Sequence, residues 1–177
     1  MSEPASLYAR LHLSEAGRAA YRASVPPPPN AYPDWESWLA GRQMHGSLSV
    51  AGLSGTWVAD PAGSILEAWL DPARSFPGNA SSKADSDTWR LSLLEFSENY
   101  GEWVSLLTVL RSAAPYVDPD RRSLVVVHDF LWGDPETDVA IELAAGESRI
   151  LDVPPAADVA EADRYLQAQR DGLDPMS

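Results

Sequence analysis

The chain has 177 residues, of which 26 are acidic and 13 basic, giving a formal net charge of −13 at pH 7. It contains no cysteine, which excludes disulfide bonds, thiolate zinc sites and cysteine nucleophiles. The apolar fraction of 45% is that of a globular protein, and we expect residues 1–177 to form a single domain around one core.

Most of the negative charge lies in the second half of the chain. Residues 1–88 carry 9 acids and 6 bases, whereas residues 89–177 carry 17 acids and 7 bases. Such an excess repels nucleic acid and anionic membranes and attracts basic proteins. The chain also lacks a secretion signal and an apolar run of the ~18 residues that a membrane span needs. We therefore expect a cytoplasmic protein with a protein partner, and neither nucleic-acid nor membrane binding.

The first quarter of the chain predicts one strand, two helices and a connector. Residues 7–13 alternate apolar and polar side chains, as a half-buried strand does. Ser14 is a suitable N-cap for a short helix over residues 15–23. Consecutive prolines predict a stiff, extended connector over residues 25–33. Asp34 then caps a second helix with a tryptophan-containing apolar face.

The middle of the chain predicts short strands and a loop. Residues 47–51, 56–59 and 64–70 are short apolar runs separated by glycine and proline, and the turn at residues 60–63 joins the last two as a hairpin. Residues 71–87 are polar and rich in serine, which is typical of a surface loop.

The second half predicts further strands around a long helix. Residues 89–96 form an apolar strand, and residues 99–114 form the most apolar helix, with Asn99 and Glu102 spaced as in a capping box. Residues 123–132 contain an uninterrupted apolar run, which indicates a central strand covered on both faces.

The remaining elements complete the predicted fold. Residues 139–143 alternate, so one face of this strand packs while the other meets solvent or a partner. Residues 148–153 predict another strand, and residues 156–169 a final helix with a narrow apolar face. Together they predict an α+β fold: a mostly antiparallel sheet of about five to seven strands with helices packed mainly on one face.

The three histidines do not predict a metal or cofactor site. His12, His45 and His128 lack the spacing of helical metal pairs such as His-Glu-x-x-His. His128 and Asp129 are adjacent at the end of an apolar strand, but neighbours on a strand point to opposite faces. Asp129 therefore cannot orient the His128 ring unless a bulge intervenes. General acid or base chemistry by His128 stays open as an alternative.

An acidic surface is the strongest functional signal. Ten acids and a single base, Arg149, lie between residues 129 and 163. An aromatic ring surrounded by carboxylates is a suitable anchor for a protein partner. The residues that we expect to contact a partner are Asp129, Trp132, Asp134, Glu136, Asp138 and Glu142. The alternative is a solvated face that only maintains solubility, with Trp132 packed in the core.

In overall character the chain resembles the immunity proteins of bacterial polymorphic toxin systems, which are small, acidic, cysteine-free α+β proteins. The resemblance includes the helix that begins Ser14-Glu15-Ala16-Gly17, the pair Trp35 and Trp38, and the strand that ends His128-Asp129-Phe130-Leu131-Trp132. It implies stoichiometric occlusion of a cognate toxin. Two other classes remain: an acidic chaperone or scaffold for a secreted effector, and an enzyme that uses His128.

Overall fold

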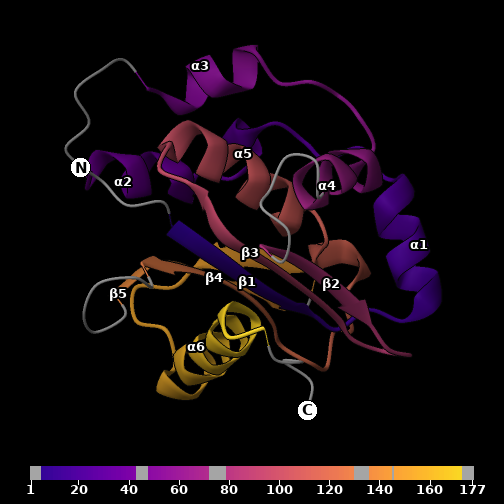
Figure 1. Ribbon diagram of the computed structural model, residues 1–177. Coiled ribbons are helices and arrows are strands. Elements are labelled where there is room, and N and C mark those ends of the chain that lie inside the picture. Colours follow the sequence, from indigo (N-terminus) through magenta and orange to yellow (C-terminus); the bar gives the residue numbers. More distant parts are fainter. Residues whose placement is uncertain (1–4, 43–47, 72–78, 130–135, 145, 173–177) are drawn as a thin grey trace.

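Six antiparallel strands form one sheet in the computed structural model (Figure 1), which describes residues 5–42, 48–71, 79–129, 136–144 and 146–172. Along the sheet the strands follow the order β2-β3-β1-β4-β5-β6. Their bounds are β1 (Ala5–Leu11), β2 (Ala80–Ala84), β3 (Trp89–Ser97), β4 (Ser123–Asp129), β5 (Glu136–Ala144) and β6 (Glu147–Ile150).

Helices cover both faces of this sheet unequally. One face is covered by α1 (Glu15–Ala23), α2 (Asp34–Ala40), α3 (Val50–Gly55), α4 (Ala62–Leu70) and α5 (Tyr100–Arg111). The other face carries α6 (Ala156–Arg170), as Figure 1 shows. Of two 3₁₀ turns, η1 (Pro29–Ala31) lies within the proline connector of residues 25–33, which is therefore not extended throughout, and η2 (Ala114–Tyr116) follows α5. The predicted α+β class, with helices mainly on one face, is confirmed.

Strand β1 lies in the middle of the sheet and is buried on both faces. Leu7 and Leu11 belong to the larger core beneath α5, while Tyr8 belongs to the smaller core beneath α6. The Tyr8 hydroxyl donates to Glu161 of α6 at 2.6 Å, and Arg10 forms an ion pair with the same carboxylate. The prediction of a half-buried strand is therefore wrong, because α6 covers the face that carries the polar side chains.

Helix α5 begins where the sequence places it. The Asn99 side chain accepts a hydrogen bond from the backbone N–H of Gly101 at 2.8 Å. Glu102 does not close a capping box, since its carboxylate accepts from the Ser97 hydroxyl instead. The helix ends at Arg111, and its buried face packs on the sheet as the continuous apolar stripe predicts.

The predicted strands over residues 47–51, 56–59 and 64–70 and the hairpin turn at residues 60–63 are wrong in the part of this region that the structure describes: residues 50–55 and 62–70 are helical, and residues 57–61 have no regular secondary structure. The Ser49 side chain accepts from the backbone N–H of Gly52 and so caps α3. In α4, a Cβ atom at Gly63 would lie 3.0 Å from the Arg22 carbonyl oxygen, so glycine permits a close approach to α1. Short apolar runs do not distinguish strand from helix by periodicity. In the structure α4 packs against α1 and α5, and α3 packs against η1.

Two further expectations are corrected at the sheet. Part of the predicted loop over residues 71–87 is the edge strand β2, which pairs with β3 despite its polar sequence. The face of β5 that was expected to meet solvent or a partner is covered at its centre, because Ala140 is 1% exposed in the core beneath α6. Among the helices that the structure describes, none has the length and apolar character of a membrane span.

Candidate functional site

The predicted partner-binding residues divide between the two ends of the sheet. Asp129 ends β4 and is paired with Glu136, which begins β5, and Asp138 follows two residues later. Glu142 lies near the other end of β5, where it is paired with Leu124. Trp132 and Asp134 lie outside the described residues. The structure thus brings Asp129, Glu136 and Asp138 together and separates Glu142 from them.

Glu142 is neutralised within the protein. Its carboxylate lies 2.8 Å from Arg149 and 3.5 Å from Arg122, and its side chain is only 14% exposed. Arg122 also pairs with Asp158 of α6. Glu142 therefore belongs to an ion network that joins the sheet to α6 and is poorly placed to meet a partner.

Three acids that sequence analysis did not select lie at the same end of the sheet as Asp129. Glu95, Glu98 and Glu102 line an open concavity of about 660 Å³. Ser97 of β3 pairs with Ala5, and His128 of β4 pairs with Ser6, so β3 and β4 end on either side of the start of β1. Two strand spacings separate them by roughly 10 Å. We name these acids the acidic end: Glu95, Glu98, Glu102, Asp129, Glu136 and Asp138.

Aromatic rings form a packed base for this concavity. Phe96 and Tyr100 line it, and their ring centroids lie 6.0 and 5.0 Å from that of Trp103. Trp38 packs edge-on against Tyr100 at 5.6 Å, and the Arg42 guanidinium lies 3.6 Å from the Trp38 centroid. The acids and aromatics of residues 95–100 are close together in the sequence, but only strand pairing places them at the same end of the sheet as Asp129 and Glu136.

The backbone of Glu95 is strained. Its φ of +51° lies in the left-handed region, and the pairing of β1 with β3 is irregular beside it. The Glu95 backbone N–H donates to the Ser6 hydroxyl at 3.1 Å, which stabilises the bend. A side chain in this conformation costs about 1 kcal/mol relative to glycine, and such strain accumulates at functional positions.

We expect Glu95→Gly to raise the free energy of unfolding by about 0.5–1 kcal/mol, because glycine adopts a positive φ without a Cβ clash. Urea denaturation measures the change. Glu98→Gly is the matched control, since Glu98 has no positive φ. Glycine there only increases the conformational entropy of the unfolded chain, so this variant should be less stable than the parent protein. Equal destabilisation by both substitutions would show that Glu95 is not strained.

His128 is buried beneath α6. It is 0% exposed, and its Nε2 lies 3.1 Å from a carboxylate oxygen of Asp163. The partner of His128 is thus on α6, a relationship that no sequence spacing could indicate. His128 lines neither the concavity beside Glu95 nor the one around Arg111 described below. His128 therefore lies in the packed layer between the sheet and α6.

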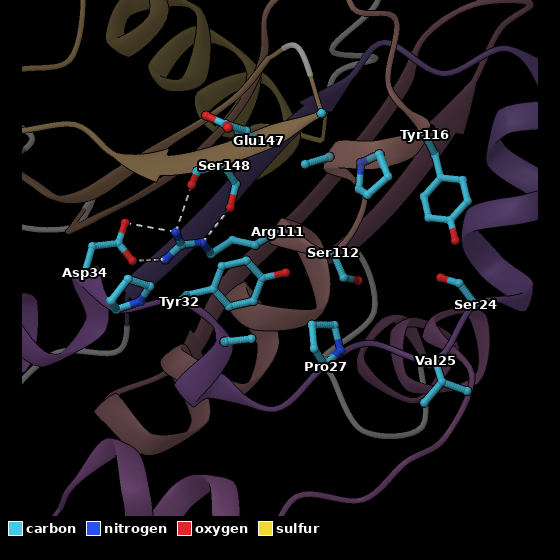
Figure 2. A pocket seen from close by; sticks show the side chains of 15 residues that line it. Ser24, Val25, Pro27, Tyr32, Asp34, Arg111, Ser112, Tyr116, Glu147 and Ser148 are labelled. Carbon is cyan, nitrogen blue, oxygen red and sulfur yellow. Dashed lines mark hydrogen bonds and ion pairs between the residues drawn. The ribbon is translucent and has the colours of Figure 1, made fainter.

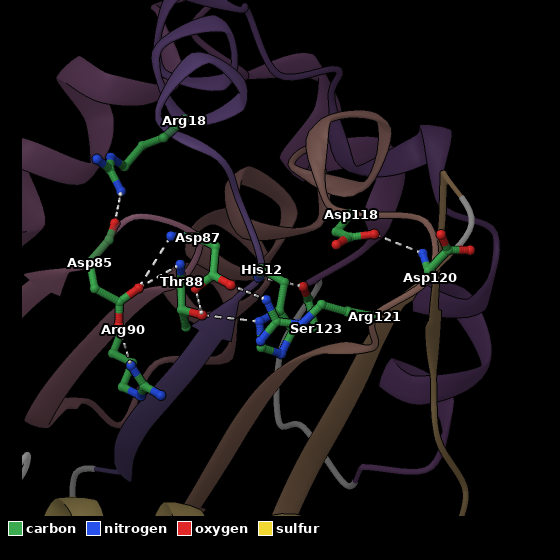
Figure 3. Close-up of polar contacts among 10 residues, drawn as sticks. All are labelled: His12, Arg18, Asp85, Asp87, Thr88, Arg90, Asp118, Asp120, Arg121 and Ser123. Atoms are coloured by element: carbon green, nitrogen blue, oxygen red, sulfur yellow. Dashed lines mark hydrogen bonds and ion pairs between the residues drawn. The ribbon is translucent and has the colours of Figure 1, made fainter.

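A second histidine joins the ends of three strands (Figure 3). His12 Nδ1 lies 3.2 Å from the Thr88 hydroxyl oxygen, and that hydroxyl donates to Asp87 at 3.0 Å. Because the Thr88 proton points to Asp87, His12 carries its proton on Nδ1 and donates it to Thr88. The His12 backbone N–H donates to the Ser123 hydroxyl at 2.8 Å. Thr88 is 3% exposed, so its hydroxyl is a structural link rather than a nucleophile.

We expect His12 to make the fold sensitive to acid. Burial of the ring, with the Arg121 and Arg10 guanidinium groups nearby, holds the pKa of His12 below its ordinary value of 6.5. The unfolded chain therefore binds a proton at a higher pH than the folded protein does. Stability is greatest above pH 6.5 and falls as the pH drops from there to the lowered folded pKa.

Denaturation midpoints measured from pH 8 to pH 5 test this. His12→Asn keeps a hydrogen-bonding side chain but does not titrate, so its stability curve is flatter than the parent curve in that window. Parallel curves for the parent protein and His12→Asn would assign the acid sensitivity to other groups.

A second concavity, of about 680 Å³, is lined by the C-terminal end of α5 and the start of β6, at the end of the sheet opposite the acidic end. Figure 2 shows the side chains around it. At its base Arg111 is 1% exposed and binds both carboxylate oxygens of Asp34, at 2.7 and 2.9 Å. Arg111 also donates to the Ser148 side chain at 2.9 Å and to the Ser148 carbonyl at 3.1 Å. Tyr32 covers the guanidinium, with its ring centroid 4.2 Å away. We name this concavity the Arg111 pocket.

The two concavities differ in the side chains that line them. The acidic end offers carboxylates and aromatic rings, which suit a cationic protein surface. Among the described residues, no group of three or more His, Asp or Glu side chains is placed to hold a metal ion. No model of a known protein family matches the chain, and no curated protein or solved structure matches it significantly.

Proposed function

We propose that this protein neutralises a basic protein partner by stoichiometric occlusion, as the immunity proteins of bacterial toxin systems do. The observation that carries the proposal is the concavity lined by Glu95, Glu98 and Glu102, at the end of the sheet where the backbone of Asp129, Glu136 and Asp138 also lies. An acidic concavity with aromatic rings complements a basic surface in charge and offers apolar contact area.

The rigidity of the acidic end favours tight binding. Glu95 and Ser97 are fixed by a hydrogen bond to Ser6 and by pairing with Ala5, so their backbone is ordered before a partner arrives. Little conformational entropy is then lost on association. Phe96 and Tyr100 are half-buried and supply apolar contact area at the centre of the charged rim.

The proposal is distinguishable from an acidic chaperone or scaffold. An occluding inhibitor forms one complex of fixed stoichiometry with a single basic partner, whereas a chaperone binds several clients. Affinity capture from the source cells, followed by size-exclusion chromatography with light scattering, separates these outcomes.

The decisive experiment is a titration of the captured partner under changing salt. We expect the activity of the partner to fall to zero at one molar equivalent, with an association rate that decreases as ionic strength rises. An association rate that is independent of salt, or a partner that keeps its activity in the complex, would contradict the proposal.

A further inference from the structure

The Arg111 pocket displays hydrogen-bond donors that the protein does not use. The hydroxyls of Tyr32 and Tyr116 line the pocket and make no hydrogen bond to any residue that the structure describes. Figure 2 shows the Tyr32 hydroxyl directed towards Ser112 and the Tyr116 hydroxyl towards Ser24. Ser112 and Ser24 already donate to backbone carbonyls within their own helical turns. Burial raises the pKa of Tyr32, so its hydroxyl stays protonated and able to donate.

The walls of the pocket are apolar and rigid. Pro27, Pro33 and Pro115 line it, and their rings fix the backbone of the connector and of η2. Val25 also lines it and is 54% exposed, which places a large apolar side chain at the rim. A preformed cavity of this size, with apolar walls and a few convergent polar groups, is typical of a ligand site.

The charges of the pocket disfavour an anionic ligand. The Arg111 guanidinium is already matched by both oxygens of Asp34, and the Glu147 carboxylate adds a negative charge to the lining. The lining contains no histidine or lysine to act as a general base for its serines. The pocket is therefore suited to binding an uncharged, apolar ligand rich in hydrogen-bond acceptors.

We propose that the Arg111 pocket binds an extended proline-rich peptide segment of a partner protein. Consecutive prolines present carbonyl oxygens without N–H groups, which complements the unused donors of Tyr32 and Tyr116. Their rings pack well against tyrosine and proline side chains, and their polyproline conformation is formed before binding, so little entropy is lost. This site is separate from the acidic end, because the two lie at opposite ends of the sheet.

Fluorescence polarisation with a labelled oligoproline of about ten residues tests the proposal. Tyr32→Phe and Tyr116→Phe each keep the ring and remove one hydroxyl, so we expect each to weaken binding by about 2- to 10-fold. Tyr165→Phe is the matched control, since the hydroxyl of Tyr165 in α6 is buried and Tyr165 does not line the pocket, and we expect unchanged affinity. Circular dichroism confirms that each variant is folded.

The competing results are distinct. No binding of oligoproline at millimolar concentration overturns the proposal, as does equal binding by the parent protein, Tyr32→Phe and Tyr116→Phe. Equal affinity for a glycine-serine peptide of the same length also overturns it, and preference for an oligoglutamate would indicate an anion site instead. The variant Glu95→Lys/Glu98→Lys should bind oligoproline with the affinity of the parent protein. Loss of partner binding at the acidic end can therefore be distinguished from loss of oligoproline binding in the Arg111 pocket.

Discussion

Arg111→Met should lower the free energy of unfolding by about 3 kcal/mol, the lower end of the usual loss when one partner of a buried ion pair is removed, because the remaining Asp34 side chain is 32% exposed. Arg111 is 1% exposed and makes its hydrogen bonds to Asp34 and Ser148, so methionine fills the volume but replaces none of them. Asp34 would then keep a partly buried charge without its cation. Urea denaturation measures the loss.

The position of this ion pair explains why the effect is large. In the edge strand β6, Ser148 directs its carbonyl away from β5, and Arg111 donates to it at 3.1 Å. The backbone N–H of Ile150 donates to Asp34 at 3.0 Å. The ion pair thus satisfies backbone groups that a further strand would otherwise pair with, and it protects the edge against aggregation. We therefore expect Arg111→Met also to aggregate more readily.

Arg149→Met is the matched control. Arg149 lies on the same strand β6, but its side chain is 72% exposed, and Glu142 keeps Arg122 as a second partner when Arg149 is removed. Exposed pairs contribute about 0–1 kcal/mol, so this variant should remain close to the parent protein. A loss of less than about 1 kcal/mol in Arg111→Met would show that the buried pair does not hold β6 in place.

The second large effect concerns the acidic end. We expect Glu95→Lys/Glu98→Lys to slow association with the captured partner by about 10- to 100-fold at low salt, because four units of charge change beside the concavity. Both side chains are exposed, so the fold should tolerate the substitutions. Stopped-flow mixing at several salt concentrations measures the rate, and the difference from the parent protein should shrink as salt rises.

Glu15→Lys/Asp120→Lys provides the control for net charge. Both residues are exposed, and they lie near the end of β1 and the start of β4, at the opposite end of the sheet. The change in net charge is the same, but its distance from the proposed interface is greater. If both double variants slow association equally, total charge rather than the acidic end controls encounter.

Sequence patterns were sufficient where the cause of the structure is local. Ser14 and Asn99 cap the helices that follow them, because a capping side chain reaches only two or three residues along the chain. The apolar run over residues 123–127 predicted a buried central strand for a similar reason, since a strand covered on both faces needs consecutive apolar residues.

Patterns failed where distant segments decide the outcome. Residues 64–70 are apolar enough for a strand or a helix, and the close approach of α4 to α1 at Gly63 decided for helix. Residues 80–84 form a strand only because β3 offers an edge to pair with. The alternation of residues 139–143 predicts that the Glu142 side chain faces solvent. In the structure it is 14% exposed and pairs with Arg122 and Arg149, and Arg122 also binds α6.

The sequence by itself determined the α+β class, the excess of negative charge in the second half and the helices that carry their own caps. Each follows from composition or from contacts between near neighbours. Only the tertiary structure placed Glu95 beside the β4–β5 acids, His128 against Asp163, and Arg111 across the edge of β6. These relations depend on strand order and helix packing, which bring together residues that no short-range pattern connects.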